Sequence, residues 1–357
     1  MSVSDVTPPT NIQDVAGRAG VSPSTVSRVL RGATNVLPET RDRVLRAAAD
    51  LGYSPSPAAS RLASGRTRTV AVIVPFVTRW FFSEVLRGVE RVLREAEYDL
   101  LLYVIGDEAS RQRFFGMMPL RRRVDAVLAV ASVFSQHELD RLQSLGVPIM
   151  SIGGTLSGAS RVGINDQDGA VMAVRHLIVL GHRDIVMISG DPGDPIGRMT
   201  TLGRQAGFKL ALREANIPDD PDRIVCEPWG VGGGARAMER LLGRARLPTG
   251  VFAESDEMAF GALQTLRKAG MAVPATVSII GFDDHEMAAP SELTTVAQPV
   301  VSQGELAGRK LLAALGDPHC SITDTELPVR LVVRGTTGPP PAARATIGGL
   351  ERAPGAS

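Results

Sequence analysis

The stretch NIQDVAGRAGVSPSTVSRVL, residues 11–30, sets the architecture of the amino-terminal part of this 357-residue chain. Apolar residues recur at helical spacing in both halves of the stretch, for example at Val15 and Ala19 in the first half. Gly20 separates the halves, since a residue without a Cβ suits the left-handed backbone of a tight turn. The Ser-Pro pair at 22–23 then favours the start of another helix, with serine as N-cap. These residues predict two short helices joined by a tight turn.

A third helix completes this amino-terminal unit, which we place at residues 1–54. Thr10 is the expected N-cap of the first helix, and the third helix runs from about Pro38 to Leu51. The residues of the third helix that we expect to face inward are Val44, Leu45, Ala48 and Leu51. Three short helices in this order follow the helix-turn-helix plan, in which the second helix enters the major groove of DNA. A three-helix bundle that only packs is the alternative, and the polar face of the second helix disfavours it.

The outward face of the second helix has the chemistry of a DNA reader. Arg28 can pair with O6 and N7 of guanine, and Ser24 can bond a base edge or a phosphate. Thr25 and Ser27 are better placed for phosphates, which fix register without reading sequence. Residues 1–66 also hold eight arginines and five acidic residues, a net charge of +3, while the whole chain carries +1. A positive head on a near-neutral body suits a polyanionic partner, although chance composition is the alternative interpretation.

Residues 55–66 form a candidate hinge. The pair Ser56-Pro57 is a second N-cap and proline signal, and Gly65 ends a segment of barely two helical turns. A helix this short is marginal in water, so we expect it to be frayed unless a partner holds it. A plain linker is the alternative, but a linker does not need a cap, a proline and an alanine run in that order.

From Thr69 onward, the pattern changes to strands that alternate with helices. We expect strands at 70–75, 99–105, 125–130, 147–152, 184–189, 224–228, 250–254, 276–284, 293–299 and 327–335. We expect helices at 83–95, 111–120, 136–145, 168–180, 199–215, 233–242, 256–269 and 302–315. Near-continuous apolar strands between helices are typical of parallel sheets that are covered on both faces. The sequence therefore predicts an α/β body of two similar lobes, each a doubly wound parallel sheet.

Ligands in such sheets bind beyond the carboxyl ends of the strands, so the residues just after each strand form the candidate effector pocket. These residues are Phe81, Phe82, Arg198, Thr200, Arg204, Trp229, Ser255 and Asp283. Aromatic faces can stack on a sugar ring or a base, while arginine and aspartate can hold hydroxyls or ring nitrogens. Packing in the core of a lobe is the alternative role for Trp80, Phe81 and Phe82. A surface ion pair is the alternative role for Arg204 and Asp283.

Other classes of function find little support in the sequence. The chain has no G-x-G-x-x-G, Walker or G-x-S-x-G motif, its five histidines lack metal spacing, and Cys226 and Cys320 fit no metal or redox pattern. We therefore expect no enzyme activity, no catalytic residue, no cofactor and no metal. No signal peptide and no apolar run of about 18 residues is visible, which predicts a cytoplasmic protein that does not span a membrane.

The run NIQDVAGRAGVSPSTVSRVL…PETRDRVLRAAADLGYSP resembles the head of the LacI family of bacterial transcription regulators. The resemblance implies that the hinge helices of two subunits pair in the minor groove, where Leu62 wedges between base steps and Ala59 allows close approach. The DNA-binding residues expected on this basis are Thr10, Ser22, Pro23, Ser24, Thr25, Ser27, Arg28, Asn35, Ser56, Ala59 and Leu62. One departure is Leu37, where the family usually has a serine that caps the third helix.

The body is similar to the type I periplasmic-binding-protein fold, in which three strands cross between lobes and the ligand sits in the cleft. The resemblance matches Arg204 and Asp283 to effector-contacting residues of the family. It also matches Arg198 and Thr200 to positions that the purine-binding branch uses.

Two departures bear on the identity of the effector. Ser255 replaces an asparagine that is common in sugar-binding members, which removes a bidentate partner. The pair Arg79-Trp80 replaces the usual Asn-Pro. Either change would suit a non-sugar or charged effector. A sugar or sugar derivative is nevertheless the favoured effector, with a purine or another metabolite as the alternative.

The sequence therefore predicts a ligand-responsive repressor that binds a palindromic double-stranded DNA operator as a homodimer. We expect the sensor at 67–338, with lobe one at about 67–165 and 298–326 and lobe two at about 166–297 and 327–338. Residues 339–357 lack heptads and are expected to be a disordered tail. Induction by the effector is favoured, and corepression stays open. An exported solute-binding receptor and a sugar- or nucleoside-processing enzyme are the rival classes; residues 1–66 argue against the first, and no catalytic constellation supports the second.

Overall fold

The computed structural model describes residues 10–30, 32–33, 35–53, 66–154, 156–194, 197–317 and 323–341. The chain divides into two compact units, Met1–Arg68 and Thr69–Ser357. In the part of the chain that is described, no helix is long and apolar enough to cross a membrane.

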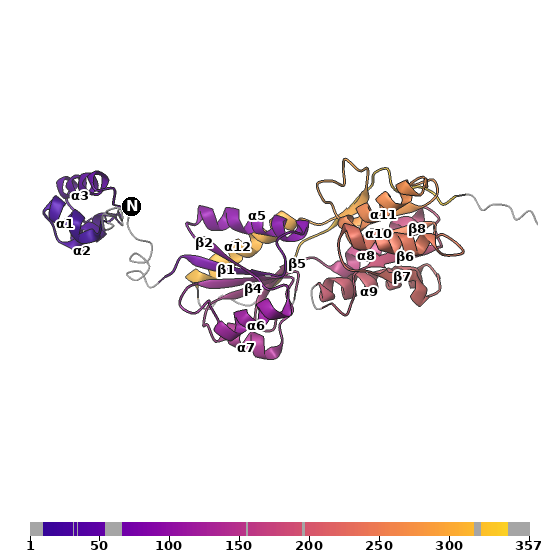
Figure 1. The fold of residues 1–357 in the computed structure, drawn as a ribbon, viewed down its shortest axis with the longest axis horizontal. Coiled ribbons are helices and arrows are strands. Elements are labelled where there is room, and N and C mark those ends of the chain that lie inside the picture. Colours follow the sequence, from indigo (N-terminus) through magenta and orange to yellow (C-terminus); the bar gives the residue numbers. More distant parts are fainter. Residues whose placement is uncertain are drawn as a thin grey trace, which may run out of the picture. The chain divides into compact units, whose positions relative to one another are not determined.

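The first unit contains the three expected short helices, α1 (Ile12–Ala19), α2 (Pro23–Leu30) and α3 (Pro38–Asp50) (Figure 1). Asn11, rather than Thr10, caps α1: its Oδ1 accepts hydrogen bonds from the amides of Gln13 at 2.8 Å and Asp14 at 3.3 Å. The carboxylate of Asp14 in turn accepts a hydrogen bond from the amide of Asn11, which completes a capping box. The predicted N-cap was therefore wrong by one residue, because the hydroxyl of Thr10 donates to the carbonyl of Leu51 instead.

Tight turns and a small apolar core hold the three helices together. Gly20 ends α1 with φ = 66°, the left-handed conformation that its lack of a Cβ permits. At the start of α2, the hydroxyl of Ser22 accepts a hydrogen bond from the amide of Thr25 at 3.3 Å. The buried residues of the core are Val15, Ala16, Ala19, Val26, Val29, Val44, Ala47 and Ala48. Leu45, which we expected to face inward, is 47% exposed, and Ala47 is buried in its place.

The second unit contains two six-stranded sheets. The strands of the first sheet are β1 (Thr69–Val74), β2 (Asp99–Val104), β3 (Ala126–Val130), β4 (Ile149–Ile152), β5 (Ser160–Gly163) and β11 (Asp324–Glu326). They lie in the order β11-β5-β4-β3-β1-β2, and all of their pairings are parallel. The first strand of each lobe thus lies inside its sheet, as in a doubly wound fold.

The second sheet repeats this plan with one exception. Its strands are β6 (Ile185–Ser189), β7 (Ile224–Cys226), β8 (Gly250–Ala253), β9 (Ser278–Asp283), β10 (Thr294–Ala297) and β12 (Arg330–Val332), in the order β12-β10-β9-β8-β6-β7. The pairings are parallel except that of β12 with β10, which is antiparallel.

Helices cover both faces of each sheet (Figure 1). They are α5 (Trp80–Glu95), α6 (Glu108–Met117), α7 (Gln136–Gln143), α8 (Asp166–Val179), α9 (Arg198–Glu214), α10 (Val231–Leu242), α11 (Asp256–Lys268) and α12 (Val300–Gly316). Alternate strand residues serve opposite faces: Val70 and Val72 pack with α5 and α12, while Ala71 and Ile73 pack with α6 and α7. In the second sheet, α8 and α9 cover one face and α10 and α11 the other.

The close packing of α5 against α12 depends on two glycines. A Cβ on Gly88 would lie 2.2 Å from the carbonyl oxygen of Val301, and one on Gly304 would lie 2.3 Å from that of Val85. Only a residue without a side chain allows backbones to approach so closely. This contact anchors α12 to the first lobe, although α12 follows β10 of the second sheet in sequence.

Three segments join the two sheets: 164–165, 298–299 and 327–329. β5 and β11, which are only four and three residues long, were not predicted from the sequence. The helix after β1 was predicted to begin at residue 83, whereas α5 begins at Trp80. The strand predicted at 327–335 is limited to β12 and runs antiparallel, an exception to the predicted parallel arrangement.

Candidate DNA-binding face and effector cavity

The amino-terminal half of α2 presents a polar face. Ser22, Pro23 and Ser24 are exposed, while Thr25 and Ser27 are half-buried. The hydroxyl of Ser22 lies 2.8 Å from that of Ser24 and 3.0 Å from that of Thr25. Small hydroxyl groups at the start of a helix, beside its free amides, are well suited to hold a phosphate oxygen.

Arg28 projects from the last turn of α2 and is exposed. It makes no ion pair with any other residue in the described part of the chain, so its five donors stay available for a planar acceptor. Asn35 is also exposed, whereas Thr10 is half-buried and bonded to Leu51. The expected hinge residues Ser56, Ala59 and Leu62 lie outside the described residues.

A cavity that opens to solvent lies in the second unit, and the empty space in and around its mouth, open solvent included, is about 740 Å³. It is lined by Arg79, Trp80, Phe81, Phe82, Ala131, Gly153, Ile164, Asp166, Gly197, Thr200, Arg204, Trp229, Ser255, Glu257, Asp283, Gln298 and Gln303. Most of these residues follow the carboxyl end of a parallel strand or lie in the first turns of the next helix. Both lobes contribute, as expected for a ligand site in a doubly wound fold.

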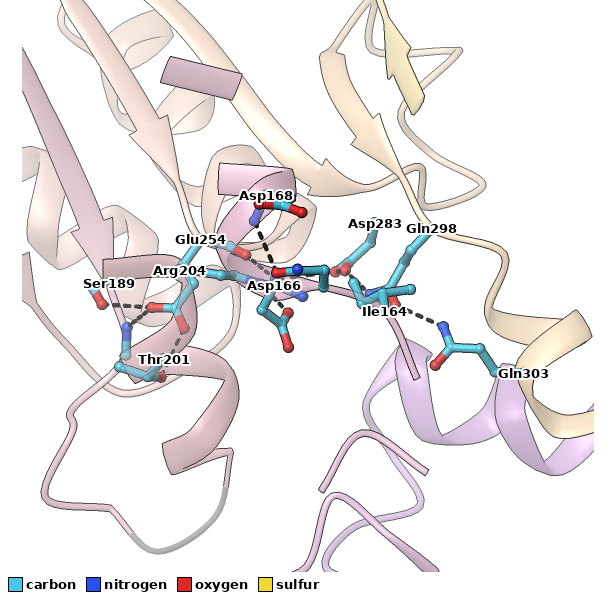
Figure 2. A network of polar contacts seen from close by, with 12 residues as sticks. Ile164, Asp166, Asp168, Ser189, Thr201, Arg204, Glu254, Asp283, Gln298 and Gln303 are labelled. Atoms are coloured by element: carbon cyan, nitrogen blue, oxygen red, sulfur yellow. Dashed lines mark hydrogen bonds and ion pairs between the residues drawn. The ribbon is translucent and has the colours of Figure 1, made fainter. Parts of the chain in front are cut away.

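Arg204 forms the polar centre of the cavity (Figure 2). It is 3% exposed, and its Nε donates to Oδ1 of Asp166 at 2.9 Å. One terminal nitrogen donates to the carbonyl of Glu254 and lies 3.8 Å from Oδ1 of Asp283. The guanidinium also stacks 3.6 Å above the centre of the Phe282 ring. These contacts on several sides hold the arginine in one orientation.

A chain of hydrogen bonds continues from this centre into the first lobe (Figure 2). The amide of Gln298 donates to Asp283 at 2.6 Å, and the amide of Gln303, on α12, donates to Gln298 at 2.9 Å. Gln298 lies on a crossing segment, so this chain links polar groups of both lobes. Burial raises the pKa of Asp283 to about 7, although Arg204 and Gln298 favour its ionised form. Asp283 also has φ = 126°, a region that side chains rarely adopt.

Behind Arg204 lies a second buried carboxylate, that of Glu254. It is completely buried and accepts hydrogen bonds from the hydroxyls of Ser189 and Thr201 at 2.6 and 2.7 Å. The amide of Gly190 supplies a third bond at 2.6 Å. Burial raises the pKa of the Glu254 carboxyl. Glu254 does not line the cavity; it fixes the start of α9, and its carbonyl positions Arg204.

The aromatic residues of α5 serve both as core and as cavity wall. Phe82 is 5% exposed and belongs to the core of the first lobe, yet it also lines the cavity. Phe81 meets it edge to face at 5.4 Å. Trp80 packs 5.0 Å from the ring of His285, which follows β9 in the second lobe, so it bridges the two lobes. The sequence left open whether these aromatic residues pack in the core or line the pocket, and the structure shows that they do both.

The other expected pocket residues differ in their positions. Trp229, Thr200 and Ser255 line the cavity. Ser255 is the N-cap of α11, and its hydroxyl accepts from the amide of Met258 at 3.3 Å. Arg198 is exposed and is not among the lining residues, so its assignment as an effector contact stays a prediction.

Several polar lining residues were not predicted as effector contacts from the sequence. They are Asp166, Glu257, Gln298 and Gln303, together with Arg79, which the sequence marked only as a departure from the usual Asn-Pro pair. Burial lowers the pKa of Arg79, against the opposing influence of Glu257 and Asp194. Asp166 and Glu257 lie in the first turns of their helices. The rule that ligands bind beyond the carboxyl ends of the strands would have predicted both residues if it had been applied to every strand. No cluster of potential metal ligands is present among the described residues.

Known protein families match both units of the chain. Residues 11–56 match the model of bacterial regulatory proteins of the lacI family, and residues 174–337 match that of the periplasmic binding protein-like domain. The chain is 33% identical over 330 residues to the HTH-type transcriptional repressor PurR of Vibrio parahaemolyticus, a match that covers 91% of this chain and 98% of that protein. It is also 33% identical over 312 residues to the ribose operon repressor of Haemophilus influenzae, covering 86% and 92%.

Solved structures show the same architecture. The transcriptional regulator CelR in complex with cellobiose superimposes with a TM-score of 0.69 at 30% identity. The match covers 92% of this chain and 100% of the CelR chain. The Lac repressor dimer bound to operator and the anti-inducer ONPF gives a TM-score of 0.81 at 24% identity, covering 92% and 99%.

A helix-turn-helix head joined to a two-lobed sensor with a polar cavity defines a ligand-responsive transcriptional regulator rather than an enzyme. The chain belongs to the lacI family of bacterial regulatory proteins. Its function is therefore DNA binding and repression under the control of an effector.

Proposed function

We propose that this regulator binds a palindromic operator as a homodimer and is released by a neutral, polyhydroxylated ring, that is, a sugar or sugar derivative. The observation that carries this proposal is the fixed Arg204, held between Asp166 and Asp283 at one wall of a cavity with aromatic side chains. The guanidinium and the two carboxyl groups offer hydrogen-bond donors and acceptors at defined positions. A hydroxyl can pair with either kind, because it can both donate and accept.

The charges that line the cavity disfavour an anionic effector. Two arginines, Arg79 and Arg204, face three carboxyl groups, those of Asp166, Glu257 and Asp283. Arg204 already donates to Asp166 and to a carbonyl, so little of its charge remains for a phosphate. A phosphorylated sugar would bring its charge beside three carboxyl groups with only Arg79 left to compensate it, at a high desolvation cost.

The remaining lining groups suit a neutral sugar. Gln298 and Gln303 each carry an amide with donors and an acceptor, and Thr200 adds a hydroxyl. Aromatic rings, of which Trp80 and Trp229 are the largest, can pack against the C–H face of a pyranose or furanose. The names of two similar proteins point the same way, since one is a ribose operon repressor and another was solved with cellobiose.

A purine or another metabolite is the alternative effector. Of the two residues matched to the purine-binding branch, Thr200 lines the cavity but Arg198 does not. This difference favours the sugar, because a purine would lack the contact with Arg198 that the match to the purine-binding branch implies.

Dimeric binding follows from the symmetry that a palindromic site requires. The Lac repressor dimer on its operator, which shares the fold, is an example of such an arrangement. An operator-binding repressor works where the chromosome is, so we propose a cytoplasmic location. If the effector and the operator favour different arrangements of the lobes, each weakens the other by a coupling of roughly 1–3 kcal/mol, which is induction.

A thermal-shift screen of the full chain tests the effector class. Neutral monosaccharides and disaccharides, sugar phosphates and nucleobases are compared at equal concentration, and each hit is added to a gel shift with the DNA upstream of the gene. We expect a neutral sugar to raise the melting temperature and to release the DNA. Stabilisation by nucleobases or sugar phosphates alone would overturn the sugar assignment, and a hit that tightens DNA binding would overturn induction.

A further inference from the structure

Three consecutive arginines, Arg121, Arg122 and Arg123, form an exposed loop between α6 and β3. Leu120 and Val124, which flank the run, are only 1% and 5% exposed and anchor it to the core of the first lobe. The amide of Arg123 donates to the carbonyl of Leu120 at 3.0 Å, so the loop is a tight turn. Buried anchors on both sides hold the three side chains out into solvent. We call this run the arginine loop.

The backbone of the arginine loop is strained. Arg122 has φ = 58°, a left-handed conformation that a long side chain adopts at a cost in free energy. Glycine would occupy this position without strain. The loop therefore keeps an arginine where folding alone favours another residue.

The charges of the arginine loop are not neutralised within the described part of the chain. None of its three guanidinium groups forms an ion pair or a side-chain hydrogen bond there, whereas Arg111, on the neighbouring helix α6, is paired with Glu138 at 2.5 Å. Three adjacent positive charges without acidic partners repel one another, and an anionic partner would relieve that repulsion.

The arginine loop lies at the edge of the first sheet where the chain arrives from the DNA-binding head. The amide of Asp125, two residues after the loop, donates to the carbonyl of Thr69, the first residue of β1, at 2.8 Å. Because β1 and β3 are parallel neighbours, the loop and Arg68 both precede strands at this amino-terminal edge. The effector cavity lies at the opposite, carboxyl end of the strands.

The covalent connection limits how far this edge can lie from the DNA-binding head. Residues 54–65 connect the last described residue of the head to Arg66, and such a segment spans at most about 40 Å. Duplex DNA carries one negative charge per about 1.7 Å of its axis, so phosphates extend on both sides of the bases that the head reads. A short tether gives a basic surface a high effective concentration at such a polyanion.

We propose that the arginine loop binds the phosphate backbone of the operator duplex, so that the sensor itself adds affinity that is independent of base sequence. The proposal rests on the DNA binding of the head and goes beyond the proposed function, which assigns the sensor only the binding of the effector. Arginine on phosphate fixes register and strengthens binding without reading bases.

Salt dependence of binding separates this role from a structural one. The full-length variant R121Q/R122Q/R123Q is compared with the wild-type chain and with R213Q/R267Q/K268Q, which removes three exposed charges from the second lobe. Dissociation constants are measured by fluorescence anisotropy for an operator duplex and a random duplex at several salt concentrations from about 50 to 200 mM. The slope of log K against log salt falls by about 0.9 for each phosphate contact that is lost.

We expect the arginine-loop variant to lose about two units of slope or more and to bind both duplexes on the order of tenfold more weakly or worse, with an unchanged operator preference. The matched control should keep the slope of the wild-type chain. An unchanged slope in the arginine-loop variant would overturn the proposal and would assign the loop to another partner, such as an acidic protein. A wild-type chain that shows no operator preference would instead overturn the proposed function, and the random duplex would still test the loop.

Two further variants keep the test valid if the triple glutamine variant folds poorly. R122G removes one charge at a position that glycine prefers, so it should fold at least as well as the wild-type chain and still lose about one unit of slope. R121K/R122K/R123K keeps the charge and should keep most of the slope. A loss of slope in the lysine variant equal to that in the glutamine variant would contradict a role for charge.

Discussion

Two arginines of this regulator lie in opposite physical settings. Arg28 is exposed on α2 and forms no ion pair within the described residues, whereas Arg204 is 3% exposed and is held by Asp166, Asp283 and the carbonyl of Glu254. DNA binding must therefore order the side chain of Arg28, at a cost in rotamer entropy, while folding has already ordered that of Arg204. Substitution of Arg28 should thus change recognition alone, and substitution of Arg204 should change folding as well.

The largest effect that we predict is that of Arg204→Ala. The substitution leaves Asp166, Asp283 and a carbonyl without their buried partner, so the free energy of unfolding of the sensor should fall by about 3–5 kcal/mol. Binding of the effector should be lost. Urea unfolding followed by circular dichroism measures the first effect, and calorimetry with the effector measures the second.

Arg198→Ala is the matched control, because Arg198 begins the same helix α9 but is exposed. It should change stability by less than about 0.5 kcal/mol. Because Arg198 does not line the cavity, we expect effector binding to remain intact, against the assignment of Arg198 as an effector contact from the sequence. If Arg198→Ala abolished effector binding while Arg204→Ala did not, the two arginines would have exchanged roles and the comparison with Arg28 would fail.

Arg28→Ala should have the next largest effect, and only on recognition. Loss of a guanine contact should cost about 1–3 kcal/mol of discrimination at one base pair of the operator, while the stability of the head stays within about 0.5 kcal/mol. Binding to a set of operators, each changed at one position, measures this loss. A uniform loss at every operator would show that Arg28 contacts phosphate and reads no base.

The head was predictable from sequence because its signals are local. Gly20 with its left-handed φ, the Ser22-Pro23 helix start and the apolar spacing all act within a few residues. The errors there are also local: Asn11 and Thr10 are both good caps, and only the bond from Thr10 to Leu51, far along the chain, decides between them.

The body was predictable in its lobes but less so in its details. β5 and β11 are too short and too polar to show a strand pattern. They form because β5 pairs with β4 and β11 pairs with β5 across a long stretch of sequence. The chain of hydrogen bonds through Gln298 and Gln303 arises because a crossing segment brings α12 back to the first lobe. Glu254 could not be identified as part of the site from the sequence, because its hydrogen-bond donors, the hydroxyls of Ser189 and Thr201 and the amide of Gly190, are distant along the chain.

Effector binding should depend on pH, because the buried carboxyl group of Asp283 has a pKa of about 7. The proposed sugar would donate hydroxyl hydrogen bonds to ionised Asp283, whose pKa is raised to about 7, so its binding should favour the form that prevails above pH 7. Between pH 6 and pH 8 the ionised fraction rises about tenfold, and the affinity for the effector should rise by up to about the same factor. Calorimetry in buffers of different ionisation enthalpy should detect proton release at pH 6.

Asp283→Asn provides the comparison for this pH effect. Its residual affinity should be nearly independent of pH over the same range, because the amide does not titrate. An affinity of the wild-type chain that falls as pH rises would mean that the effector uses the protonated carboxyl as a donor. DNA binding through the exposed face of α2 should show neither dependence.

The smallest effect concerns the uncapped third helix of the head. Leu37 occupies the N-cap position of α3 without a side-chain cap and is 75% exposed, so its side chain contributes little burial. Leu37→Ser would supply a hydroxyl for the free amides of the first turn and should stabilise the head by about 1 kcal/mol. Hydrogen exchange of the α3 amides should slow about fivefold where it reports opening of the head.

Leu37→Ala separates capping from the removal of an exposed leucine, since alanine cannot accept a hydrogen bond. Equal protection in the serine and alanine variants would show that the cap contributes nothing. The affinity for the effector should be the same in both variants, because the sensor forms its own compact unit. The operator affinity could instead fall in both variants, although the head is more stable in the serine variant. That result would mean that the exposed Leu37 contacts DNA and that leucine replaces the usual serine because it takes part in recognition.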